Sequence, residues 1–129
     1  MNILLWILQA LLAAIFAWHG WLFLAPSPAI AALMNAMLPR WFQVALGIAE
    51  ILGAIGLILP SATRVLPKLT VAAAVGIMLV TICATVLHAT RGETSSAITT
   101  AVLFAIAAFV AHGRWKTYPI TPKSERGSH

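Results

Sequence analysis

Acidic residues are scarce in this sequence: three of its 129 residues are Asp or Glu, and charged residues of both signs make up 9%. Soluble domains carry roughly a quarter charged residues, so this chain lacks the charge that solvates a water-exposed surface. Its hydrophobic share of 61% also excludes intrinsic disorder, which needs a weakly hydrophobic chain. The composition therefore predicts a membrane protein, and the length predicts one domain.

Cysteine and the common catalytic motifs are also missing or rare. The single cysteine, Cys83, excludes an intrachain disulfide and a Cys-x-x-Cys redox pair. Gly-rich phosphate loops, nucleophile elbows and zinc-finger spacings are absent from the sequence. The net charge is +5, but Lys and Arg lie at chain ends and loops rather than along one face, so we expect no nucleic-acid partner.

Four apolar runs, each close to the roughly 20 residues that cross a bilayer core, dominate the chain. Prolines, glycines or charged residues separate them, and they cover about residues 3–24, 41–59, 69–88 and 96–112. They are continuous and show no alternation of period two, which favours helices over barrel strands. A shorter apolar segment, Pro28 to Leu38, follows the candidate N-cap Ser27. The predicted fold is all-α: a four-transmembrane-helix bundle over residues 1–118, with a short interfacial helix between helices 1 and 2.

The basic residues predict how the spans are oriented. An even number of spans places both termini and the loop between spans two and three on one side, which carries Arg64, Lys68, Arg114, Lys116 and Lys123. The other side carries Arg40 and Arg91. The positive-inside rule therefore predicts a bacterial inner-membrane protein with cytoplasmic termini. Residues 119–129 are expected to form a cytoplasmic tail, with 126–129 resembling an expression tag, and the lack of a basic residue before Ile3 argues against a signal peptide.

Glu50 is the acid that falls inside an apolar run. It lies about nine residues from either end of the second run, or about 13 Å from each interface. An ionised carboxylate there is costly, so it must be protonated, paired or in contact with a hydrated cavity, and such acids commonly handle protons, ions or ligands. The alternative is a protonated Glu that only holds two helices together. Gln43, Gly47 and Ala54 share its helix face, which we expect to point into the bundle.

Two histidines are predicted to approach Glu50 in depth. Side chains tilt toward the N-terminus of their helix, so His19 and His88 tilt toward the bilayer centre while Glu50 tilts toward the outer surface. We therefore predict catalytic roles for Glu50 and His19. For His88, a hydrogen-bonded residue between helices is the alternative to a ligand contact.

A wider ligand-binding group is predicted around this pair, formed by His88, Gln43, Thr85 and Thr81. Both threonines lie on the helix face of His88, and the alternative is that they bond to carbonyls of their own helix. Two histidines and a glutamate could also hold a metal or haem. However, the chain has no His-x-x-Glu or Glu-x-x-His pair and no fourth strong ligand, so neither cofactor is expected.

Four stretches carry a resemblance to a known family. Phe16-Ala17-Trp18-His19-Gly20 contains a His-Gly near the end of the first span, and the most specific stretch is residues 47–64; residues 87–93 and 113–115 close the third and fourth spans. Together they resemble the DoxX-like family of small four-helix bacterial membrane proteins. Many members carry a lysine shortly after the His-Gly, where this chain has Trp21, Leu22 and Phe23. A cationic partner for Glu50 is missing from that position, which directs attention to His19.

The resemblance implies a link to quinone-coupled oxidation, because the family is named from a subunit of a thiosulfate:quinone oxidoreductase. It leads to the hypothesis of an oxidoreductase-associated component that binds a small hydrophobic molecule, such as a quinone, in an outer-leaflet pocket around Glu50. Whether the chain is an enzyme by itself stays open. A small proton-coupled transporter using Glu50 and a non-catalytic membrane assembly partner are the alternatives. Membrane lipid is an expected partner, and a homo-oligomer or a complex partner is compatible with so narrow a bundle.

Overall fold

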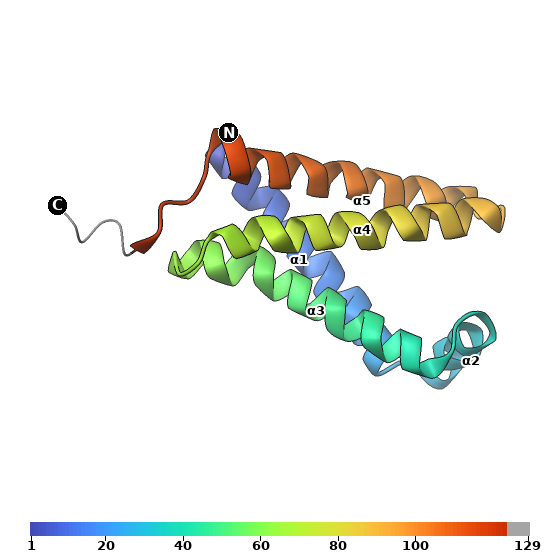
Figure 1. Ribbon diagram of the computed structural model, residues 1–129. Helices are drawn as coiled ribbons and strands as arrows, with labels where there is room; N and C mark the ends of the chain where they lie inside the picture. The colour runs from blue at the N-terminus through green and yellow to red at the C-terminus, as the bar shows by residue number, and fades with distance from the viewer. Residues whose placement is uncertain (124–129) are drawn as a thin grey trace.

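The computed structural model describes residues 1–123, and helices account for most of them (Figure 1). A π-helical segment continues the last helix, and the chain order is α1 (Asn2–Leu24), α2 (Pro28–Met37), α3 (Arg40–Thr63), α4 (Lys68–Thr90), α5 (Thr94–His112) and η1 (Gly113–Thr117). Within the described residues, four helices are long and apolar enough to cross a membrane, the last one including η1. The predicted all-α architecture, with a short helix between the first two spans, is confirmed.

The four long helices form two pairs. α1 packs along α3, α4 packs along α5, and contacts between α3 and α4 join the pairs. In Figure 1 the pairs lie together at the end of the bundle that holds Met1 and η1, and they diverge toward the end that holds α2. We call these the terminal end and the distal end.

The main apolar core extends from the bundle centre toward the terminal end. Its buried side chains come from all four long helices: Leu12, Phe16, Ala54, Leu57, Ala74, Ile77, Ala107, Val110 and Ala111. The buried hydroxyls of Ser61 and Thr70 form a hydrogen bond of 2.7 Å that joins α3 to α4. The two pairs are therefore held together in this half, by packing and by a buried polar contact.

Two glycines set the closest approach of α1 and α3. A Cβ added to Gly20 would lie 2.8 Å from the Gly47 carbonyl oxygen, and one added to Gly47 would lie 2.8 Å from the Gly20 carbonyl oxygen. Any side chain at either position would push the backbones apart, which is why small residues occupy such crossings in membrane helices. The crossing lies one residue from His19 and three from Glu50, so it fixes how these two side chains face each other.

Side-chain hydrogen bonds fasten the loop around α2. Ser27 accepts a bond from the first turn of α2, as its position in the sequence predicts. Arg40, at the start of α3, donates to the final carbonyls of α1, those of Phe23 (2.6 Å) and Leu24 (2.9 Å). The guanidinium thereby satisfies helix-end acceptors that would otherwise face an apolar environment.

α3 does not stop at Pro60, where the sequence predicted its end. The helix continues through the proline to Thr63 and ends at Arg64, whose backbone is left-handed at φ 60°. Proline removes one backbone donor and crowds the carbonyl four residues earlier, and membrane helices tolerate this loss when side chains and neighbouring helices compensate. Here the Thr63 hydroxyl donates to the Leu59 carbonyl (2.8 Å), within the same final turn.

The end of the chain also differs from a simple tail. The fourth span extends past His112 through η1. Residues 119–123 then fold back over the terminal end, where Arg64 donates through Nε (2.9 Å) and Nη2 (2.6 Å) to the Thr121 carbonyl. The amide of Lys123 donates to the Arg64 carbonyl (3.0 Å). The predicted tag at residues 126–129 lies outside the described residues.

Candidate functional site

A cavity of about 560 Å³ lies between the two helix pairs in the distal half of the bundle. Side chains from α1, α2, α3 and α4 line it, and most are apolar, among them Phe23, Met34, Phe42, Leu46, Cys83 and Leu87. His19, Glu50 and His88 also line it, so the structure brings all three of these predicted site residues to one space. Its volume falls within the range of about 300–1,000 Å³ that small-molecule sites occupy.

His19 and Glu50 form a direct pair on the wall of this cavity. His19 Nδ1 lies 2.6 Å from Glu50 Oε2, and the exposed fractions of the two side chains are 53% and 2%. The His19 ring packs edge-on against Phe23, with 4.8 Å between ring centroids, which restrains its orientation. A proton can therefore pass between a buried carboxyl group and an imidazole that reaches the molecular surface.

His88 has a hydrogen-bond partner that the sequence analysis did not name. Its Nδ1 lies 2.7 Å from Oε2 of Glu93, and the side chains are 24% and 38% exposed. Glu93 is the N-cap of α5 and its amide also donates to the His88 carbonyl (2.9 Å). The sequence analysis overlooked Glu93 as part of the site. Its signal was a His five residues before a Glu, on either side of an Arg-Gly turn.

A comparison with protein families covers most of the chain. A model described as the DoxX-like family matches residues 7–110. The chain belongs to the DoxX-like family. The matched region includes both His–Glu pairs of this DoxX-like protein and ends before η1. Membership of this family, together with four helices that are long and apolar enough to cross a membrane, indicates a multi-pass membrane protein. A comparison with curated proteins gave no match, and neither did one with solved structures.

In this DoxX-like protein the other predicted ligand-binding residues lie outside the cavity wall. Gln43 is fully buried, and its Nε2 donates to Asn35 Oδ1 (2.9 Å) and to the Leu38 carbonyl (2.8 Å). It therefore fastens the end of α2 to α3. No part of Gln43 is among the groups that line the cavity described above.

The two threonines bond to their own helix, which was the alternative given for them. Thr81 donates to the carbonyls of Ile77 (2.8 Å) and Met78 (3.1 Å). Thr85 donates to the Thr81 carbonyl (2.7 Å) and its hydroxyl also contacts that of Thr100 on α5 (2.8 Å). Of these bonds, the Thr85–Thr100 contact joins α4 to α5, and neither Thr81 nor Thr85 is among the residues that line the cavity. Ligand contacts by Gln43 and both threonines stay predictions.

Metal-binding geometry is absent from the part of the chain that the structure describes. No three of its His, Cys, Asp and Glu residues lie close enough together to hold an ion. The two His–Glu pairs instead form separate contacts, one at the α1–α3 crossing and one at the turn between α4 and α5. The arrangement is chemically suited to proton transfer and hydrogen bonding beside an apolar space.

Proposed function

We propose that this DoxX-like protein binds a small hydrophobic molecule, such as a quinone, in the distal cavity, and that Glu50 exchanges a proton with the bound molecule. The observation that carries the proposal is the 2.6 Å contact between Glu50 and His19 on the wall of a mainly apolar cavity of about 560 Å³. Apolar walls with few polar groups are typical of sites for such ligands.

The lining chemistry favours a flat or flexible hydrophobic ligand. Aromatic Phe23 and Phe42 offer faces for ring packing, while Met34 and Met37 can adapt to an irregular shape. A quinone carbonyl accepts hydrogen bonds, and its reduction takes up electrons and protons in equal number. Glu50 would supply a proton to the carbonyl oxygen, while a redox protein of the membrane would supply the electrons.

His19 would then restore the proton on Glu50. Its ring is half exposed, so it can take a proton from outside and pass it through Nδ1 to the buried carboxyl group. His88 and Glu93 lie at the distal mouth, where their partly exposed pair would contact the polar end of an entering ligand. Catalytic roles for Glu50 and His19 and a binding role for His88 are part of this proposal.

The single cysteine supplies a direct test, because Cys83 lines the cavity and is exposed. A short-tailed ubiquinone with a fully substituted ring should slow alkylation of Cys83 by N-ethylmaleimide in lipid nanodiscs. Glu50→Gln should weaken this protection. As a matched control, Ala101→Cys in a Cys83→Ala background places the thiol on an exposed part of α5, where the quinone should not alter the rate. Equal protection of both cysteines, or of neither, would overturn the proposed site.

A proton-coupled transporter is the second candidate, because Glu50 is a buried acid beside a space that ligands can enter. Uptake of tetraphenylphosphonium into liposomes under a proton gradient would test it. Uptake that is lost in Glu50→Gln would favour transport over ligand binding alone. If the Glu50→Gln and His19→Ala variants keep full function in cells, and another membrane protein copurifies with the chain, the role of a non-catalytic assembly partner would be favoured instead.

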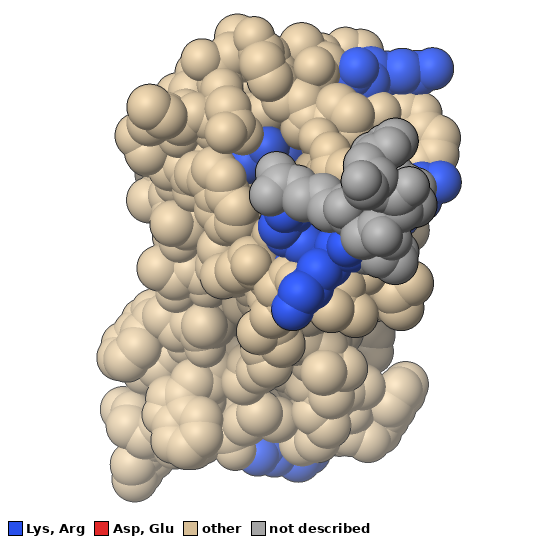
Figure 2. Space-filling view, turned by 90° about the vertical axis from the view of Figure 1, so that its left-hand side faces the viewer, with Lys and Arg blue, Asp and Glu red and all other residues tan. Residues whose placement is uncertain are grey.

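We also propose that the terminal end faces the cytoplasm of a bacterial inner membrane. Figure 2 views the molecule from the terminal end, where Lys and Arg side chains gather and no Asp or Glu is visible among the described residues. The distal end carries Arg40 and Arg91. In intact cells, a membrane-impermeant maleimide should label Ser27→Cys and not Thr117→Cys, both in a Cys83→Ala background. The reverse pattern would overturn the orientation.

A further inference from the structure

The terminal end has basic side chains without acidic partners in the part of the chain that the structure describes. Figure 2 shows the Lys and Arg side chains that gather at this end. Lys68, Lys116 and Lys123 are exposed, Arg64 is partly buried and Arg114 is buried beneath them. Glu50 and Glu93 are each paired with a histidine farther along the bundle. Residues 1–123 therefore offer no carboxylate to these cations.

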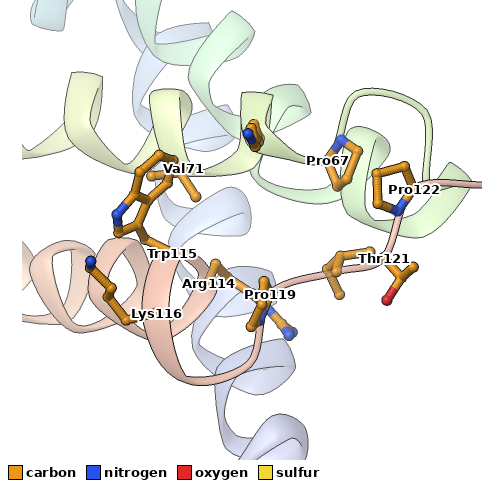
Figure 3. A pocket seen from close by; sticks show the side chains of 10 residues that line it. Pro67, Val71, Arg114, Trp115, Lys116, Pro119, Thr121 and Pro122 are labelled. Carbon is orange, nitrogen blue, oxygen red and sulfur yellow. The ribbon is translucent and has the colours of Figure 1, made fainter. Parts of the chain in front are cut away.

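A pocket of about 480 Å³ lies within this basic region, between the start of α4, η1 and the segment after η1 (Figure 3). We call it the Arg114 pocket. Trp115 extends from η1 toward Val71 on α4 and forms one apolar wall. Lys68 and Lys116 also line the pocket, and Lys68 Nζ lies 5.8 Å from the centroid of the Trp115 ring. The pocket thus combines a flat apolar wall with two exposed ammonium groups.

Arg114 lines this pocket and is 4% exposed. Its Nε donates to Gln9 Oε1 (2.6 Å), and its Nη1 donates to Asn2 Oδ1 (2.7 Å) and the Tyr118 carbonyl (3.1 Å). Nη2 has no hydrogen-bond partner among the described residues. These acceptors are all neutral, so within residues 1–123 the buried cation has an unpaired donor and no counter-charge.

Such a group is costly to bury unless an anion accompanies it. Trp6 covers one face of the guanidinium, with Cζ 5.2 Å from its ring, but a ring face does not supply an acceptor in the plane of the N–H groups. Arg114 also lines a neighbouring pocket across residues 118–121. An anion seated beside it would supply both the missing charge and the missing acceptor.

We infer that the Arg114 pocket binds a phosphate group, with the headgroup of an anionic phospholipid as its source. Nε and Nη1 of Arg114 are already bonded to neutral acceptors, so Nη2 is the donor left for a phosphate oxygen. Lys68 and Lys116 add charge at the rim. The pocket lies where the third span begins at Lys68 and the fourth ends at Thr117, which is the depth of lipid headgroups. Trp115 supplies the apolar contact for the adjoining glycerol and upper acyl chain. This inference is independent of the proposed function of the distal cavity.

Native mass spectrometry of the full chain in a neutral detergent can measure the affinities for phosphatidylglycerol and phosphatidylcholine. We expect a preference for phosphatidylglycerol, with Lys68→Gln and Lys116→Gln each weakening its binding about five-fold. Both lysines are exposed, so these variants should fold. Arg91→Gln at the distal end removes the same charge and should leave the affinity unchanged.

The outcomes distinguish a specific phosphate site from non-specific attraction of anionic lipid to a basic protein. An equal loss in Arg91→Gln, or no loss in either lysine variant, would overturn the inference. Inorganic phosphate is the second probe: if it raises the unfolding temperature as much as phosphatidylglycerol does, and displaces that lipid, the lipid source is wrong and the pocket takes a soluble phosphate.

Discussion

The two ends of the bundle solve the burial of a charged group in different ways. At the α1–α3 crossing, Glu50 is paired with a second titratable group, His19, beside an apolar cavity. At the terminal end, Arg114 donates to neutral oxygens, and one of its nitrogens has no acceptor among residues 1–123. A carboxyl group and an imidazole can each gain or lose a proton, whereas a guanidinium holds its charge. The two proposals depend on this difference: proton exchange in the distal half and anion binding at the terminal end.

The largest effect is expected in the distal half, at the glycine crossing of α1 and α3. Gly47→Ala places a Cβ 2.8 Å from a backbone oxygen of α1, so the helices must separate. We expect a loss of about 2–3 kcal/mol in the free energy of unfolding, typical of overpacking, and weaker ligand binding because His19 moves from Glu50. Equilibrium unfolding in mixed micelles measures the change in the free energy of unfolding. Gly76→Ala is the matched control, since nothing lies within 4 Å of its added Cβ.

The next effect tests the proton-exchange assignment of the distal half. Glu50→Gln keeps the size of the side chain and a hydrogen bond to His19 but removes the titrating proton. We expect the fold to persist and quinone affinity to fall about ten-fold, which is the contribution of a hydrogen bond from a neutral carboxyl group to the quinone carbonyl. The quinone concentration that slows Cys83 alkylation measures this affinity. Unchanged affinity would leave Glu50 as a structural contact and remove the contrast with Arg114.

A smaller effect is expected from Arg64→Gln at the terminal end. It removes two exposed hydrogen bonds to Thr121 that hold residues 119–123 across the bundle. These bonds should contribute about 1 kcal/mol, so the segment after Tyr118 should become more sensitive to proteolysis while the spans stay folded. Unchanged proteolysis would mean that residues 119–123 are held by side-chain packing against the helices rather than by the Arg64 hydrogen bonds.

The smallest effect is expected for Glu93→Gln at the distal mouth. Its pair with His88 is partly exposed, and such ion pairs contribute about 0–1 kcal/mol. Quinone affinity should change less than three-fold or so, well below the loss in Glu50→Gln. A loss as large as that of Glu50→Gln would move the main proton group from the bundle centre to the mouth.

Several elements of the site could be predicted from residue positions alone. The depth of Glu50 and the tilt of His19 follow from helical rise and side-chain direction, and the structure places these two groups in contact. The same argument brought His88 to the depth of Glu50, and both line one cavity. The contact of His88 with Glu93 could not be predicted in this way, because it depends on the shape of the turn between α4 and α5. Gln43 and Thr81 share the expected faces, yet their polar atoms bond to neighbouring backbone or side chains. Facing inward does not determine whether a polar group meets a ligand or the protein.

The sequence by itself determined the four spans, the short helix between the first two, and the isolation of Glu50 in an apolar run. These properties depend on the transfer free energy and periodicity of local segments. Only the tertiary structure decided that the pairs meet at the terminal end and diverge around a cavity, and that Arg114 is buried with no acid beside it in the described part of the chain. Helix divergence depends on contacts between distant residues, such as Gly20 with Gly47, whose close approach is invisible within either segment alone.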